Sequence, residues 1–147
     1  MITDEYLFVA LVTSIVVLAS AFVHYEGLRF LTDRVPAPKQ ENRRRVLLMI
    51  LLLLCLHVIQ IWIFGLTYLW LIGLGDYGGL GGVDSAGLVD SIYFSAMVYT
   101  TIGFGDLYPT GPLRLMVGME GITGLTMITW SASYTFIEMG KDWKKDE

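Results

Sequence analysis

The clearest chemistry in this sequence lies in the run Thr100–Asp106, TTIGFGD, which we call the glycine segment (residues 100–106). Gly103 and Gly105 alternate with bulky residues, so the backbone can take φ angles of either sign at every second position. Such alternation can direct successive carbonyl oxygens toward one shared axis. A ring of these oxygens, contributed by several chains, can replace the water shell of a cation. The segment therefore predicts a backbone site for an ion.

Two apolar stretches must position this segment. Residues 88–99 precede it and have a helical pattern, but they are too short to cross a hydrocarbon core of about 30 Å. Residues 113–138 follow it and are long enough to span. Non-helical backbone at membrane depth is tolerated only inside protein or along a watery path. We therefore expect a re-entrant helix that leads into a pore lining; a glycine-rich turn between two membrane helices is the alternative.

In this context the glycine segment resembles the selectivity filter of tetrameric potassium channels, usually Thr-Val-Gly-Tyr-Gly-Asp. In layout the resemblance covers residues 46–140, and in detail it continues into Tyr93–Ser95 and Leu107–Pro109. It implies that K⁺ is bound by the backbone carbonyls of four residues, with the threonine hydroxyl forming the innermost site: Thr101, Ile102, Gly103 and Phe104. It also implies that a further set of residues supports the filter: Tyr93, Thr100, Gly105, Asp106 and Glu120.

Two positions depart from the family pattern. Phe104 replaces the more common tyrosine, so a phenolic hydroxyl is lost, and Met97 stands where some relatives carry a carboxylate. Both changes remove support from the filter. Glu120 lies inside the third apolar stretch, where a bare carboxylate facing lipid is costly. We predict that it packs behind the short helix and accepts hydrogen bonds from Ser95, Tyr99 or Thr100; coordination of an ion in the cavity is the alternative.

The composition is that of a membrane protein. The chain has 147 residues, of which 54% are hydrophobic, and its mean hydropathy is +0.59. The one cysteine, Cys55, lies in an apolar run and predicts no disulfide. We see no nucleophile–base pair, nucleotide motif or metal-ligand spacing, so we expect no enzyme activity, organic cofactor or nucleic-acid partner. Potassium ions in the filter are the cofactor that we expect.

The predicted fold class is an all-α membrane protein assembled as a tetrameric pore, with three transmembrane helices, a re-entrant pore helix and a selectivity filter. An N-terminal transmembrane helix (residues 1–31) and a cytosolic basic linker (32–45) precede the pore domain (46–140), and a cytosolic tail (141–147) follows it. The pore domain divides into the outer helix (46–72), an exposed turret loop without helix or strand (73–87), the pore helix (88–99), the filter (100–106) and the inner helix (113–138).

The charges predict the orientation in the membrane. Nine of the ten Lys and Arg residues lie between residues 29 and 45 or after residue 140, and Arg114 is the exception. Because cytoplasmic flanks attract Lys and Arg, we expect the N-terminus outside and the linker and C-terminus in the cytosol of a plasma-membrane protein. The basic run also predicts contact with anionic lipid headgroups, a topology signal alone being the alternative: Arg43, Arg44 and Arg45.

Polar and small residues interrupt the three spans. His24 falls near the end of the first span, where we expect it to anchor at the interface. His57 and Gln60 are three residues apart and share one face of the second span. For His57 we favour a hydrogen bond to the first helix or to a neighbouring subunit, with a proton sensor as the alternative. In the third span three glycines permit close helix contact, and each is a candidate gating hinge: Gly118, Gly121 and Gly124.

The function that these expectations describe is passive conduction by a potassium-selective homotetramer. One chain supplies one glycine segment, so a closed ring needs four chains. The first span carries no repeated arginines, so we expect shallow voltage dependence, with control in the filter or at an inner-helix crossing near residues 130–136. The alternatives are a non-conducting accessory subunit and a pore subunit of a potassium uptake system.

Overall fold

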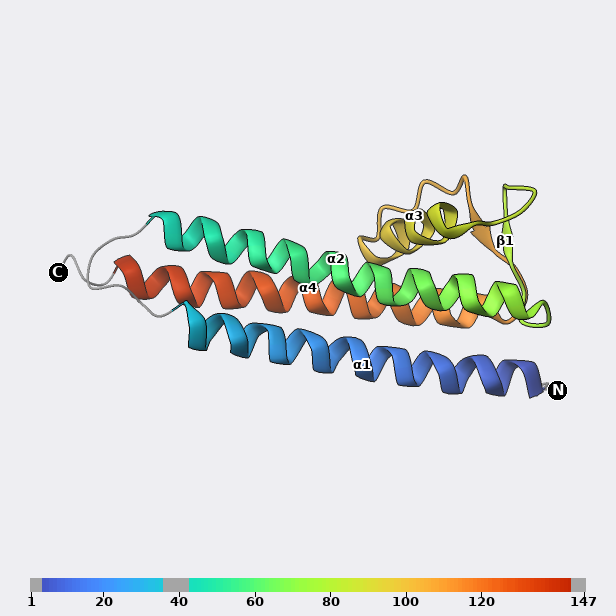
Figure 1. Cartoon of the computed structure of the whole chain (residues 1–147), viewed down its shortest axis with the longest axis horizontal. Coiled ribbons are helices and arrows are strands. Elements are labelled where there is room, and N and C mark those ends of the chain that lie inside the picture. Colours follow the sequence, from blue (N-terminus) through green and yellow to red (C-terminus); the bar gives the residue numbers. More distant parts are fainter. Residues whose placement is uncertain (1–3, 36–42, 144–147) are drawn as a thin grey trace.

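The computed structural model of the chain describes residues 4–35 and 43–143. Three long helices run side by side, and a short helix lies against one half of this bundle (Figure 1). In chain order, the helices and strands are α1 (Asp4–Arg34), α2 (Arg43–Leu74), β1 (Leu80–Gly81), α3 (Leu88–Tyr99), β2 (Tyr108–Pro109) and α4 (Leu113–Trp143).

Two helices of this described part, α1 and α2, are long and apolar enough to cross a membrane. Their outward faces carry large apolar side chains, such as Leu18 and Phe22 of α1, which are 70% and 65% exposed. Such surfaces are unfavourable in water and match the hydrocarbon of a bilayer. The chain is an all-α membrane protein. α4 is as long as α1, at 31 residues, but it is not apolar enough to be a candidate membrane span by length and composition.

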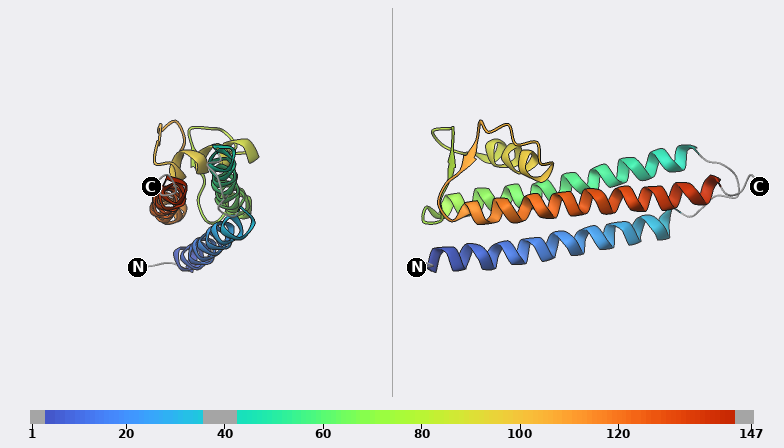
Figure 2. Two further views of the ribbon diagram at one scale, coloured as in Figure 1. Left: turned by 90° about the vertical axis from the view of Figure 1, so that its left-hand side faces the viewer. Right: turned by 180° about the vertical axis from the view of Figure 1, so that it is seen from behind.

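The chain reverses direction between successive long helices. The N-terminal end of α1 lies at the end of the bundle that carries the strands, and α4 runs from that end back to the opposite one (Figure 1). The view from behind shows the same relation (Figure 2). The start of α1, the short helix α3 and the glycine segment therefore share one half of the molecule.

Glycines allow α3 to lie close to α2 and α4. A Cβ added at Gly65 of α2 would come within 2.5 Å of the Ile92 side chain and 3.0 Å of its Cα. A Cβ at Gly124 of α4 would collide with the backbone carbonyl of Tyr99. Small residues at such crossings permit close backbone approach, as is common where helices pack in membranes. Buried aromatic rings fill the remaining space around α3: Phe64, Tyr68, Phe94 and Tyr99.

A two-residue antiparallel ladder ties the loop of residues 73–87 to the chain that follows the glycine segment. Leu80 of β1 pairs with Pro109 of β2. Gly78 and Gly82, on either side of β1, have φ angles of +99° and +96°, and a Cβ at either would collide with the facing backbone. The expectation of a loop without a strand was wrong, because a ladder this short has no periodic sequence pattern.

The long helices extend beyond their expected apolar limits. α1 continues to Arg34 rather than residue 31, α2 covers Arg43–Leu74 rather than 46–72, and α4 continues to Trp143 rather than 138. Hydropathy locates the apolar part of a helix, but helical hydrogen bonding continues into the polar turns beyond it. α3 begins and ends where the short helix was expected, at Leu88 and Tyr99. Parts of the predicted linker and tail, residues 36–42 and 144–147, lie outside the described residues, as do residues 1–3.

Candidate functional site

The backbone of the glycine segment alternates as its sequence predicts. The angle φ is +59° at Thr101, +54° at Gly103 and +82° at Gly105, and the residues between them are outside this left-handed region. Glycine adopts these angles without strain, whereas a β-branched threonine does so only when its surroundings hold it there. The N–H of Thr101 donates to the Val98 carbonyl at 3.0 Å, which fixes this residue to the last turn of α3.

Four carbonyl oxygens of the segment accept no hydrogen bond from the described residues. Every residue from Thr101 to Asp106 is exposed. Gly103 donates its own N–H to the Met97 carbonyl at 3.2 Å. Among residues 4–35 and 43–143, however, no donor reaches the carbonyls of Thr101, Ile102, Gly103 or Phe104. Four adjacent carbonyls are thus available to a cation, and they belong to the four residues that the resemblance implies.

Side chains fasten both ends of the glycine segment to α3. The Tyr93 hydroxyl donates to Asp106 Oδ2 at 2.8 Å. This hydrogen bond raises the pKa of the Tyr93 phenol, because the carboxylate accepts the proton that ionisation would remove. At the other end, Thr100 Oγ1 donates to the Ala96 carbonyl at 2.6 Å. Three of the residues expected to support a filter thus hold the segment against α3 by hydrogen bonds: Tyr93, Thr100 and Asp106.

Glu120 of α4 lies behind α3 and has no exposed surface. Its two carboxylate oxygens are each 2.5 Å from a hydroxyl, one on Ser95 of α3 and the other on Tyr68 of α2. Ser95 was among the three expected donors, whereas Tyr68 was not. Ser95 Oγ also lies 2.9 Å from the Ile61 carbonyl. The carboxyl group therefore ties the short helix to both of the long helices that flank it.

A second buried group of polar side chains begins at Tyr99, the last residue of α3. The Tyr99 hydroxyl donates to Gln60 Oε1 and lies 2.9 Å from His57 Nδ1. Gln60 Nε2 lies 3.0 Å from His24 Nδ1 on α1. The other ring nitrogen of His24, Nε2, is 3.3 Å from Ser131 Oγ on α4. This hydrogen-bond chain, which runs from His57 through Tyr99, Gln60 and His24 to Ser131, joins α1, α2, α3 and α4.

The expectation for His24 was wrong, and the expectation for His57 is contradicted only for the first helix, since its contact with a neighbouring subunit stays a prediction. His24 has no exposed surface and lies inside the bundle, because it belongs to the stripe of α1 that packs against the other helices. It is therefore not an interfacial anchor. His57 bonds to α3 rather than to α1, and Gln60, three residues further along α2, makes the contact with α1 instead. The rotation of α2 about its axis decides which of the two polar residues faces α1.

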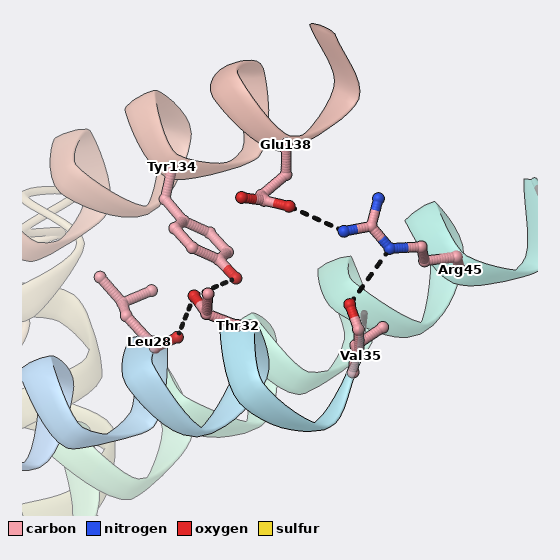
Figure 3. Close-up of polar contacts among 6 residues, drawn as sticks. All are labelled: Leu28, Thr32, Val35, Arg45, Tyr134 and Glu138. Atoms are coloured by element: carbon pink, nitrogen blue, oxygen red, sulfur yellow. Dashed lines mark hydrogen bonds and ion pairs between the residues drawn. The ribbon is translucent and has the colours of Figure 1, made fainter. Parts of the chain in front are cut away.

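At the opposite end of the bundle a buried ion pair joins α2 to α4 (Figure 3). Arg45 Nη2 lies 2.7 Å from Glu138 Oε2, and Arg45 Nε donates to the Val35 carbonyl at 3.2 Å. Beside this pair, the hydroxyls of Thr32 and Tyr134 are 3.1 Å apart. The expected contact with lipid headgroups is wrong for Arg45, because its charge is buried against a carboxylate. For the two arginines before it, that contact stays a prediction.

The three hinge candidates on α4 differ in their surroundings. A Cβ at Gly118 would meet nothing within 4 Å, and one at Gly121 would lie 3.9 Å from the Val98 carbonyl. A Cβ at Gly124, in contrast, would collide with the Tyr99 carbonyl. Gly124 is therefore explained by close packing against α3, and a hinge role is left to the other two.

The spacing of polar residues along α1 and α2 indicated hydrogen-bond partners that were not among the expected ones. Gln60 and Tyr68 are eight residues apart with Phe64 midway, so the three share one face of α2. Ser20 and His24 have the same four-residue spacing on α1. Polar side chains at this spacing on an apolar helix indicate a face that packs on protein rather than lipid. No such pattern says which helix that face meets.

A family model described as an ion channel matches residues 48–141. The matched region holds most of α2 and α4 and all of α3 and the glycine segment, and it leaves α1 outside. No curated protein and no solved structure matches the chain. The family is one of transport proteins rather than enzymes. Because the match covers more than half of its length, the chain belongs to this ion channel family.

Proposed function

We propose that this protein is a potassium-selective channel that conducts K⁺ passively through the carbonyls of its glycine segment. The observation that carries the proposal is a positive φ at every second residue, combined with four adjacent carbonyls that accept no hydrogen bond from the described residues. Carbonyls of this kind, arranged as a ring, replace the hydration shell of K⁺. Ions at adjacent sites repel one another forward, which permits fast conduction despite close coordination.

The proposal requires four chains. One chain supplies one row of carbonyls, whereas a ring needs several rows around a common axis. In the single chain the large side chains of the segment are uncovered, with Ile102 55% and Phe104 73% exposed. Apolar groups in this state favour burial against neighbouring copies. A symmetric homotetramer supplies both the ring and this cover.

We infer further that α4 is a third membrane-crossing helix and that α3 is re-entrant. α4 lies alongside α2 (Figure 2). α4 also carries large exposed apolar residues, among them Ile122, Leu125 and Phe136. α3, with 12 residues, is too short to cross and occupies one half of the bundle (Figure 1).

The charge distribution supports a position in the cell membrane with the N-terminus outside and the C-terminus in the cytosol. Most Lys and Arg residues lie near the junction of α1 and α2 or in the last residues of the chain. The last turn of α1, the first turn of α2 and the last turn of α4 are at the end of the bundle opposite β1 and β2 (Figure 1). Cytoplasmic flanks attract Lys and Arg, so the glycine segment would open outward.

Reconstitution into liposomes tests this function. Purified protein should pass K⁺ in preference to Na⁺ in a flux assay and should migrate as a tetramer in detergent. Gly103→Ala should lower the K⁺ preference by roughly ten-fold or more, because alanine resists the φ of +54° found there. Gly73→Ala is the matched control, since its Cβ meets nothing within 4 Å. Equal passage of both ions, or a stable monomer, would refute the proposal, and assembly without flux would indicate an accessory subunit.

A further inference from the structure

Helix α1 lies outside the region that the ion channel family matches, yet the buried hydrogen-bond chain connects it to the base of the glycine segment. His24 on α1 contacts Gln60, and Gln60 contacts Tyr99, which immediately precedes the segment. Gln60 and Tyr99 have no exposed surface, as is also true of His24. A change at His24 can therefore reach the segment through two buried side chains.

One assignment of hydrogens satisfies this hydrogen-bond chain. Tyr99 donates its hydroxyl hydrogen to Gln60 Oε1, so His57 Nδ1, 2.9 Å away, must carry a hydrogen and donate it to the Tyr99 oxygen. The amide nitrogen of Gln60 then donates to His24 Nδ1 at 3.0 Å and to the Ser20 carbonyl at 3.3 Å. His24 Nδ1 is consequently an acceptor, and the hydrogen of this ring is on Nε2.

A proton on His24 Nδ1 is incompatible with that arrangement. Two donors, His24 Nδ1–H and the Gln60 amide, would then face each other at 3.0 Å. A half-turn of the Gln60 amide restores the bond by placing Oε1 toward His24, although it removes the Nε2 hydrogen bond to the Ser20 carbonyl. The amide N–H₂ then faces Tyr99, which must accept from it and donate its own hydrogen to His57 Nδ1.

His57 completes the reversal. To accept from Tyr99, its ring must release the hydrogen on Nδ1 and take one on Nε2, so the net change is the uptake of one proton by His24. The reversal requires water to enter the cavity of about 370 Å³ that His57, Tyr99 and Ser131 line. The same side chains therefore allow two arrangements of hydrogen bonds, and a proton added to His24 Nδ1 permits only the second.

We propose that His24 is a positioning residue of the pore, whose protonation reverses the hydrogen bonds through Gln60 to Tyr99 and so alters the support of the glycine segment. The inference rests on the proposed channel function. In a tetramer, protonation also places four imidazolium ions around the pore, and these oppose the entry of cations. Acidification should therefore lower the flux of K⁺.

Neighbouring groups on α1 and α2 do not neutralise a charge on His24. Glu26 follows it by two residues on α1 and pairs with Arg29 at 3.7 Å. The titratable neighbour on α2 is His57, whose ring centroid is 5.6 Å from that of His24. Two positive rings at this distance repel each other, so we expect one proton per subunit.

The groups that α3 and α4 contribute are also uncharged or engaged elsewhere. α3 contributes the hydroxyl of Tyr99. On α4, the Trp130 ring lies 5.3 Å from the His24 ring, and Ser131 contributes a hydroxyl. The carboxyl of Glu120 is held by its own two hydroxyl partners, and no described carboxylate forms an ion pair with His24. A proton on His24 is therefore accommodated by hydrogen-bond direction rather than by a salt bridge.

Nitrogen-15 NMR of the solubilised protein tests the hydrogen-bond chain directly, because the sequence has two histidines. At neutral pH we expect His24 with its hydrogen on Nε2 and His57 with its hydrogen on Nδ1. As His24 takes up a proton, His57 should change tautomer over the same pH range. In Gln60→Leu the two rings should titrate without this coupling. Uncoupled rings in the parent protein would overturn the inference.

Flux of K⁺ into liposomes is the functional readout. The parent flux should fall roughly three-fold or more through the His24 transition seen by NMR. His24→Leu removes the acceptor of the Gln60 amide and should lower the K⁺ preference at neutral pH. His24→Asn supplies an amide oxygen in place of Nδ1 and cannot be protonated, so it should restore the preference without the acid response. Thr13→Val is the matched control, since Thr13 is buried on α1 and bonds to the Val9 carbonyl of its own helix.

These outcomes separate the inference from the channel function. If the parent conducts K⁺ selectively and His24→Asn keeps the parent's acid response, the inference is refuted while the channel function stands. If the parent passes no K⁺ under any condition, the proposed function fails and the positioning role fails with it. Loss of the acid response in Thr13→Val as well would attribute the effect to α1 packing and refute the role of His24.

Discussion

Replacing Glu120 by leucine should destabilise the protein by leaving one buried hydroxyl without an acceptor. In the parent, the carboxyl lies 2.5 Å from the hydroxyls of both Tyr68 and Ser95. Leucine is similar in size to glutamate but accepts no hydrogen bond. Ser95 keeps an acceptor, because the Ile61 carbonyl is 2.9 Å away. Tyr68 has no exposed surface and no second acceptor among the described residues.

The expected loss of stability follows from the single hydroxyl of Tyr68. An unsatisfied buried hydroxyl costs about 1–3 kcal/mol, and a homotetramer would suffer the loss four times, roughly 4–12 kcal/mol per assembly. In each chain, a loss of about 1–3 kcal/mol is a large fraction of the roughly 5–15 kcal/mol that stabilises a typical domain. The Glu120→Leu tetramer should therefore dissociate at a clearly lower temperature. Size-exclusion chromatography in detergent after stepwise heating measures the fraction that stays assembled.

Two further variants isolate the cause. Glu120→Gln keeps an oxygen for Tyr68 and offers an N–H to Ser95, whose hydroxyl then donates to Ile61, so its stability should be close to that of the parent. Tyr68→Phe in the leucine background removes the stranded hydroxyl and should restore most of the loss, because apolar replacement of both partners is nearly neutral. The reasoning is refuted if Glu120→Leu is as heat-resistant as the parent, or if the added Tyr68→Phe change restores nothing.

Further predictions concern packing, topology and voltage. Gly124→Ala should lower the free energy of unfolding by about 1–3 kcal/mol, because its Cβ meets the Tyr99 carbonyl, and Gly118→Ala should raise it by up to about 1 kcal/mol. Chemical denaturation in detergent compares the two, and equal effects would contradict the packing argument. In a cysteine-free background, a cysteine at Thr3 should react with an impermeant thiol reagent from outside and one at Lys145 should not; the reverse pattern would overturn the positive-inside argument. Bilayer recordings should show shallow voltage dependence, because α1 carries no repeated arginines, and steep activation would contradict this.

The glycine segment could be predicted from the sequence because its conformation is local. Gly103 and Gly105 lack a Cβ, so their order along the chain is enough to predict alternating φ. The first and last residues of α3 could also be predicted from the sequence. The Gly87 N–H bonds to the Asp90 carboxylate at the start of the helix, and the glycine segment ends it. Composition indicates membrane character, because helices as long and apolar as α1 and α2 match the hydrocarbon thickness of a bilayer.

Only the tertiary structure decided the polar partners. Tyr68 and Glu120 are 52 residues apart, and His24 and Ser131 are 107 apart. The sequence determined that these are polar residues on apolar helices. It did not determine the rotation of each helix, and one residue of rotation moves a side chain by about 100° around the axis. That rotation is set by packing, at close crossings such as Gly124 against Tyr99, which is why His24 lies inside the bundle and not at its edge.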